Sequence, residues 1–290
     1  MNVILAIDAQ SFSSKTAKYA IEYAKKLGIT SPLSDNLTLA LGASSVTPLE
    51  LTNAYATFAS GGYRLTPFAL IKVTDRRGQV LEEIAQPTLP VFTPHTSAAV
   101  DQQPAGSPTA LPPAVQNQAP GAPTPPGTET VAPAPPTSVS ALLPVPVISP
   151  ETAFVITSLM QSVVQSGTGR RALAVGRPVA AKTGTTNDMK DAWFVGFIPQ
   201  LVAGVWVGFD QEKSLGAGGS GGQAAAPIWT EFMQKAVAGM PVEQFKAPAN
   251  ISSVTINPAT GRLVPEGSPG SVREYFISGT EPKGYDSDSR

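Results

Sequence analysis

A proline-rich tract divides the sequence and limits what the rest of the chain can fold into. Between residues 86 and 150 lie 17 of the chain's 29 prolines, with no lysine or arginine and with Asp101 and Glu129 as the only acidic residues. A tract of Pro, Ala, Thr and Gln buries too little apolar surface to offset the entropy lost on ordering. We therefore interpret residues 86–149 as a disordered insert, in part polyproline II, and expect the flanking segments to build the fold.

The composition narrows the classes of function. The formal net charge is −1, only 14% of residues are charged, and no basic block is present, so no nucleic-acid partner is expected. Cysteine is absent, which excludes disulfides and thiol chemistry. The single histidine, His95, lies in the tract, and we expect no metal and no cofactor. Residues 1–8 lack the length and basic start of a signal peptide, and no later apolar run spans a bilayer, so we expect no membrane segment in this chain.

Before the tract, local signals predict two helices and a surface hairpin. Thr47, Pro48 and Glu50 form a capping box with proline at the first helical position. Tyr19 is assigned to the inward stripe of the first helix. The predicted elements are a helix from Ser13 or Ser14 to Leu27, a helix from residue 48 to the glycines at 61–62, and a hairpin of residues 67–73 and 79–81.

After the tract, the patterns predict a helix, three strands, a second helix and a small β region. The tight connection around Pro199 favours antiparallel strands, and Ile228 and Phe232 are assigned to the inward stripe of the last helix. The glycines of residues 216–222 lack the context of a phosphate-binding loop and are interpreted as a flexible loop. The predicted ranges are 150–166, 178–183, 191–197, 201–209, 224–238 and 245–284, and the core aromatic residues are Trp193, Phe194 and Trp206.

The strongest candidate for a functional site follows the first of these strands. A short apolar run ends in Lys182 and Thr183, which predicts a buried strand that delivers an ammonium group and a hydroxyl to the mouth of a site. Gly184 would leave the strand edge bare for the backbone of a ligand. The alternative is a strand end with a solvated lysine and a turn, and the three-residue motif alone does not decide between them.

Six segments of the sequence together carry a resemblance to a known family: residues 39–51, 54–62, 182–186, 191–196, 205–208 and 224–229. They resemble the penicillin-binding transpeptidase family, and more narrowly the bifunctional, high-molecular-weight class A enzymes of peptidoglycan synthesis. The resemblance covers nearly the whole chain outside the tract. It implies a penicillin-binding transpeptidase (β-lactamase-like) fold of the α+β or α/β class, with an antiparallel sheet flanked by helices and an incomplete N-terminus.

On this basis we expect four regions. Residues 1–85 are the first part of a truncated transpeptidase domain and residues 86–149 are the disordered insert. Residues 150–240 hold the sheet with the Lys-Thr-Gly strand and the C-terminal helix. Residues 241–290 form a small β appendage that closes over the main body, followed by a polar tail.

The family's catalysis uses three motifs: Ser-x-x-Lys, Ser-x-Asn and Lys-Thr-Gly. The serine attacks the carbonyl between two D-alanines of a stem peptide, and an amine from a neighbouring strand resolves the acyl-enzyme. The resemblance implies that Lys182 and Thr183 bind the terminal carboxylate, that Thr185 adds a second hydroxyl and half of an oxyanion hole, and that Gly184 and Thr186 complete the substrate-binding strand. The implied partners are D-Ala-D-Ala stem peptides and β-lactams.

Only the Lys-Thr-Gly motif is complete in this sequence. No lysine has a serine three residues before it, and the spacing from Ser11 to Lys15 is one residue too long. Asn2 matches the last position of Ser-x-Asn. We therefore expect the nucleophilic serine, its lysine, the glycosyltransferase domain and the membrane anchor in an upstream part of the same synthase, which in the family lies at the outer face of the cytoplasmic membrane, in the periplasm.

Three hypotheses about function stay open. The chain is a fragment of a serine-type D,D-transpeptidase that is inactive alone, a non-catalytic module that binds peptidoglycan stem peptides, or a non-functional remnant with an exposed core. Whether the isolated chain is an enzyme is undecided, and so is whether it is a natural truncation or a cut piece. A D,D-carboxypeptidase or β-lactamase fits less well, because residues 39–62 and the β tail resemble the class A synthases.

Overall fold

A three-stranded antiparallel sheet lies at the centre of the structure, a computed structural model that describes residues 14–36, 38–39, 42, 44–83 and 143–286. The strand order is β5-β6-β7, and the last two strands are antiparallel with a tight connection as predicted, although it has two residues where the predicted ranges leave three. The first strand begins and ends two residues later than expected, which brings Gly184 and Thr185 into the sheet. The strands are β5 Ala180–Thr185, β6 Ala192–Ile198 and β7 Leu201–Val207.

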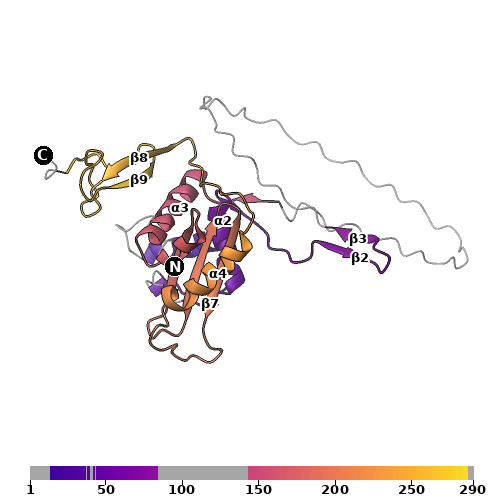
Figure 1. Ribbon diagram of the computed structural model, residues 1–290. Helices are drawn as coiled ribbons and strands as arrows, with labels where there is room; N and C mark the ends of the chain where they lie inside the picture. The colour runs from indigo at the N-terminus through magenta and orange to yellow at the C-terminus, as the bar shows by residue number, and fades with distance from the viewer. Residues whose placement is uncertain (1–13, 37, 40–41, 43, 84–142, 287–290) are drawn as a thin grey trace, which may run out of the picture.

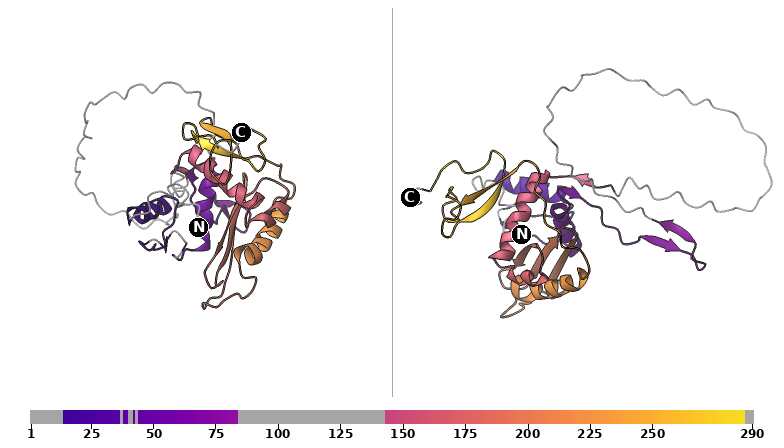
Figure 2. Two further views of the ribbon diagram at one scale, coloured as in Figure 1. Left: turned by 90° about the vertical axis from the view of Figure 1, so that its left-hand side faces the viewer. Right: turned by 45° about the horizontal axis from the view of Figure 1, so that its top comes forward.

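Helices cover both faces of this sheet (Figures 1 and 2). Because side chains alternate along a strand, Val195 and Phe197 pack with α1, α2 and α3, whereas Phe194 packs on the opposite face with α4. On that second face Phe194 meets Trp229 at 5.1 Å between ring centroids. The helices are α1 Ser14–Lys26, α2 Pro48–Ala59, α3 Pro150–Gln165, the 3₁₀ segment η4 Arg170–Val175 and α4 Ala226–Ala236.

The predicted capping box is present at the start of α2. The Thr47 side chain accepts from the Glu50 backbone N–H, and Glu50 Oε2 accepts from the Thr47 N–H at 3.0 Å. The same carboxylate also accepts hydrogen bonds from Thr30 and Ser31, so it ties the beginning of the α1–α2 connection to the start of α2. Hydrogen bonds from the Ser31 and Thr30 hydroxyls and the Thr47 backbone hold the pKa of the Glu50 carboxyl far below its ordinary range.

Three assignments of inward-facing side chains are wrong. Tyr19 is 54% exposed, since α1 presents Ala17 and Ala24 to the core instead. Ile228 and Phe232 are each 52% exposed. The helical period is the same, but α4 is rotated so that the buried residues are Trp229 and Met233, together with Ala226 and Thr230.

A short strand pair joins the two sides of the proline-rich tract. β1, Tyr63–Arg64, pairs with β4, Val145–Pro146, although the expected insert included residues 145–146. Gly62 lies at this junction with φ of 104°, and a Cβ there would be 2.3 Å from the Ile148 carbonyl oxygen, so only glycine fits. The chain therefore leaves the body at residue 64 and returns beside it at residue 145. The rest of the predicted insert, residues 86–142, and its expected disorder lie outside the described residues.

Two small β units lie at the periphery. The predicted hairpin consists of β2 Lys72–Thr74 and β3 Val80–Glu83, is exposed throughout, and projects away from the helices (Figure 1). The appendage consists of β8 Ile251–Ile256 and β9 Val272–Ile277, antiparallel and packed beside α3 through an edge-on contact of Tyr275 with Phe154. Among the helices of the described ranges, none has both the length and the apolar character needed to cross a bilayer.

Candidate functional site

The Lys182 to Thr185 segment forms the last four of the six residues of β5. Burial decreases along the strand, from fully buried Ala181 through half-buried Lys182, Thr183 and Gly184 to exposed Thr185. In the described part of the chain β6 is the strand that pairs with β5, and no strand pairs with its other edge. The segment thus places a cation and two hydroxyls at an open strand end.

Lys182 and Thr183 point to opposite faces of the sheet. Lys182 is paired with Val195, which belongs to the cluster with α1 to α3, and Thr183 is paired with Phe194, which faces α4. A ligand on one face would meet only one of the two side chains. A ligand at the open edge of β5 would meet the ammonium from one side and the hydroxyls of Thr183 and Thr185 from the other.

The Lys182 ammonium makes one hydrogen bond to the described part of the protein. Its Nζ donates to the Thr183 carbonyl oxygen at 2.8 Å, and no acidic side chain forms an ion pair with it in the described ranges. Burial lowers the pKa of this ammonium below its ordinary value. An ammonium has three donors, so the described residues leave two of them for a ligand. A carboxylate at this position would offset the cost of burying the charge.

Two hydrogen bonds, one from a side chain and one from the backbone, fix the threonine hydroxyls. Thr183 Oγ1 lies 2.7 Å from Thr168 Oγ1, and Thr185 Oγ1 accepts the Gly221 backbone N–H at 2.9 Å. Thr168 belongs to the turn after α3 and Gly221 to the π-helical turn Gly221–Ala225 before α4. The hydroxyls are therefore oriented from two separate segments before any ligand arrives.

Gly221 packs directly onto the strand pair. A Cβ at this residue would lie 2.3 Å from the Trp193 carbonyl oxygen and 2.5 Å from that of Gly184. The interpretation of residues 216–222 as a flexible loop is therefore wrong at its end, where Gly221 is buried against β5 and β6. The reason is that the turn must approach bare backbone, which requires glycine for contact rather than for mobility.

Thr186 has a different environment from the two threonines before it. Its Oγ1 accepts the backbone N–H groups of Lys190 and Asp191 at 3.0 and 2.8 Å and closes the turn between β5 and β6. Because this hydroxyl is used within its own turn, Thr186 does not join Thr183 and Thr185 at the open edge of β5. Asn2, the other predicted site residue, lies outside the described residues.

The aromatic residues next to the site are only partly in the core. Phe194 is fully buried as expected, Trp193 is half-buried, and Trp206 is 38% exposed. The expectation for Trp206 is wrong: it lies next to the end of β7, where its indole N–H donates to Asp191 Oδ1 at 2.9 Å. Sequence reasoning also missed Thr168 and Gly221. Thr168 lies between two glycines, directly after the helix predicted for residues 150–166.

No group of three or more potential metal ligands is found in the described part of the chain. The described site instead offers one ammonium, two hydroxyls and a strand edge, which is a donor set for a carboxylate on an extended peptide.

Known proteins are similar to this chain in sequence and in fold. A family model described as "Penicillin binding protein transpeptidase domain" matches residues 129–234, and another, "Penicillin-binding protein 1A, C-terminal domain", matches residues 247–290. The chain is 39% identical over 277 residues to penicillin-binding protein 1A of Pseudomonas aeruginosa. The chain belongs to the penicillin-binding transpeptidase family. A second family member, penicillin-binding protein 1A of Aquifex aeolicus, is 37% identical over 262 residues.

A solved structure confirms the penicillin-binding transpeptidase fold. Penicillin-binding protein 1A of Haemophilus influenzae superposes with a TM-score of 0.70 at 28% identity and covers 98% of this chain. The M. tuberculosis protein PonA1, solved in complex with penicillin V, has the same fold with a TM-score of 0.54 at 24% identity. This chain spans 32% of the P. aeruginosa relative, 28% of the A. aeolicus relative and 39% of the H. influenzae chain. It thus corresponds to a C-terminal portion of these family members.

Proposed function

We propose that this chain forms the carboxylate-binding side of a D,D-transpeptidase site in a peptidoglycan synthase. The observation that carries the proposal is the open end of β5, where half-buried Lys182 has no acidic partner among the described residues and the Thr183 and Thr185 hydroxyls are fixed beside it. Membership in the transpeptidase family supplies the reaction class, acyl transfer from stem peptides that end in D-Ala-D-Ala.

In this proposal each group has one task. The Lys182 ammonium and the Thr183 hydroxyl hold the terminal carboxylate of the stem peptide, and Thr185 adds a second hydroxyl. The free edge of β5, bare at Gly184, pairs with the peptide backbone. The Thr185 N–H forms half of the oxyanion hole, and since one such donor contributes about a hundred- to a thousandfold in rate, this half alone gives little catalysis.

The same proposal leaves the bond-breaking step to groups outside the sequence. No Ser-x-x-Lys occurs in the chain, so the attacking serine and the lysine that activates it would come from an upstream part of the same synthase, on the periplasmic side of the membrane. β-Lactams, which mimic D-Ala-D-Ala, would bind this side of the site without acylating the isolated chain. Asn2 would contribute the asparagine of the second motif.

A peptide titration tests the proposal. The isolated chain should bind an N-acetylated stem peptide ending in D-Ala-D-Ala and should not bind the same peptide with a C-terminal amide. Lys182→Ala should remove binding, and the control Lys235→Ala, an exposed lysine of α4 paired with Glu231, should not. Equal binding of acid and amide peptides, or an unchanged affinity in Lys182→Ala, would refute the proposal.

The alternative of a non-catalytic stem-peptide module rests on the same geometry and differs only in what lies upstream. Covalent labelling distinguishes the catalytic site from the non-catalytic module. If a longer chain that contains the upstream sequence is acylated by a labelled penicillin, the site is catalytic, and if it only binds, the module hypothesis holds. A cooperative unfolding transition of the isolated chain would argue against a non-functional remnant.

A further inference from the structure

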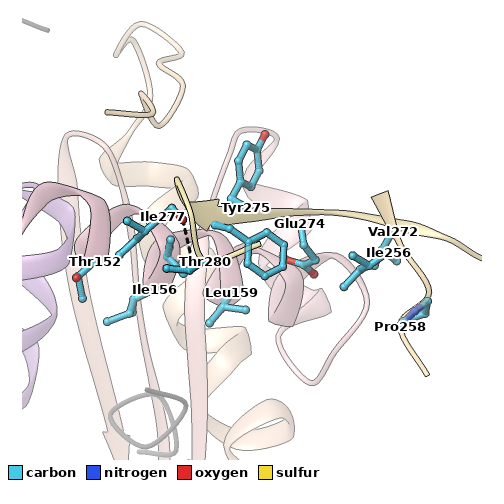
Figure 3. Close-up of a pocket in the computed structure, with 12 residues that line it drawn as sticks. Thr152, Ile156, Leu159, Ile256, Pro258, Val272, Glu274, Tyr275, Ile277 and Thr280 are labelled. Atoms are coloured by element: carbon cyan, nitrogen blue, oxygen red, sulfur yellow. Dashed lines mark hydrogen bonds between the residues drawn. The ribbon is translucent and has the colours of Figure 1, made fainter. Parts of the chain in front are cut away.

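A groove separate from the β5 edge lies between α3 and the β8–β9 appendage (Figure 3). Its volume is about 510 Å³, within the usual range of ligand pockets. One stripe of α3, which includes Val155 and Leu159, forms one wall, and Ile256, Val272 and Phe276 of the appendage form the other. The site proposed above is on a different strand and contributes no residue to this lining.

α3 has two apolar stripes, and only one of them is used by the core. Ile156, Met160 and Val164 are buried among the helices and the sheet. Val155 and Leu159 lie on the adjacent stripe, and Leu159 is 38% exposed although the appendage packs beside it. The appendage therefore bridges this second stripe without filling the space above it.

Glu274 is the one charged residue in the lining. It lies on β9, and in Figure 3 its side chain projects from the strand near Leu159 and Ile256. Burial raises the pKa of the Glu274 carboxyl, and the Tyr275 backbone N–H offsets this only in part. No basic side chain pairs with Glu274 in the part of the chain that the structure describes. The groove thus combines apolar walls with one carboxylate that lacks a cation.

The shape of the groove favours an extended occupant. β9 lines it along its whole length, Val272–Ile277. At about 3.3 Å per residue these six residues extend roughly 17 Å, the length of about five residues of extended peptide. A compact amine would leave most of such a groove empty.

We propose that the α3–β9 groove binds a peptide segment of a partner protein in which one lysine or arginine lies between apolar residues. The apolar residues lie against Leu159, Val272 and Phe276, and the cation pairs with Glu274. This charge complementarity is what selects a basic peptide over an acidic or neutral one. The proposal does not depend on the function of the β5 edge.

Two end-capped pentapeptides test it by calorimetric titration: one with a central lysine between valines and leucines, and one with glutamine in its place. The lysine peptide should bind the full chain about tenfold more tightly than the glutamine peptide, and Glu274→Gln should remove that difference. Leu159→Ala should weaken both peptides, whereas Ile228→Ala, an exposed apolar residue of α4, should weaken neither. Denaturation midpoints of the variants show that each is folded.

Several results would overturn the proposal. Equal affinity for both peptides would show that Glu274 does not select the lysine. Equal losses of peptide affinity in Leu159→Ala and Ile228→Ala would show that the peptide binds outside the groove. If neither peptide binds, the groove has no such ligand. If sedimentation shows a dimer that Leu159→Ala dissociates and the lysine peptide does not, a second copy of the chain occupies the groove instead.

Discussion

Gly221→Ala should destabilise the chain strongly, although it adds a single methyl group. The new Cβ would lie 2.3 Å from the Trp193 carbonyl oxygen and 2.5 Å from that of Gly184, where ordinary contact begins at 3.4 Å. Both oxygens belong to paired strands, so the π-helical turn has to move by about 1 Å, at a typical overpacking cost of about 1–3 kcal/mol. The move also breaks the Gly221 N–H bond to Thr185 Oγ1, worth about 1 kcal/mol. The expected loss is about 2–4 kcal/mol.

Urea denaturation followed by tryptophan fluorescence measures this loss, since Trp193, Trp206 and Trp229 all lie on or against the sheet. Gly284→Ala is the control, because a Cβ there meets no atom within 4 Å. It should change the free energy of unfolding by less than about 1 kcal/mol. A loss below about 0.5 kcal/mol in Gly221→Ala would refute the close packing of this turn on β5 and β6.

Two further predictions concern Thr168 and Glu50. Thr168→Val should weaken binding of the D-Ala-D-Ala peptide about threefold to tenfold, because Thr183 loses the hydroxyl group that orients its own. Thr168→Ser keeps that hydroxyl group and should bind the peptide as the parent chain does. Equal affinities of the parent chain and both variants in an NMR titration would contradict this role of Thr168. Glu50→Gln should lower the free energy of unfolding by about 1–2 kcal/mol at neutral pH. Because folding depresses the pKa of Glu50, its stabilisation is present above about pH 4.5 and is lost as the pH falls further, so the variant should lose less stability than the parent chain between about pH 5 and pH 3. If the free energies of unfolding of Glu50→Gln and the parent chain fall in parallel as the pH is lowered, the stabilising role of the Glu50 carboxylate is contradicted.

The sequence predicts the ends of helices and strands well where residues close together in the chain determine them. Thr47 and Glu50 fix the start of α2 through a capping box, and Pro199 marks the turn between β6 and β7. The direction of a helix's buried face was harder to predict. On α4, several apolar residues are present on more than one side, and the partner sheet selects Trp229 over Phe232.

The candidate site was predictable only along the strand. Lys182 to Thr185 stand out as one motif, but their fixing contacts come from Thr168 and Gly221, which are 15 and 36 residues away from their partners. A threonine between two glycines and a glycine in a glycine-rich stretch are typical of loops. Only tertiary packing distinguishes them as contacts of the strand. The role of Trp206 was missed for a similar reason, because its hydrogen bond to Asp191 depends on the register of β6 and β7.

The most direct measurement of the central claim is the pKa of the Lys182 ammonium, followed by NMR of the lysine side chains with and without the D-Ala-D-Ala peptide. In the free chain burial holds this pKa below its ordinary value. A bound carboxylate stabilises the protonated form, so the pKa of Lys182 should rise when the peptide binds and should stay unchanged with the C-terminal amide. A Lys182 pKa that responds equally to both peptides, or to neither, would contradict a carboxylate-binding role for the end of β5.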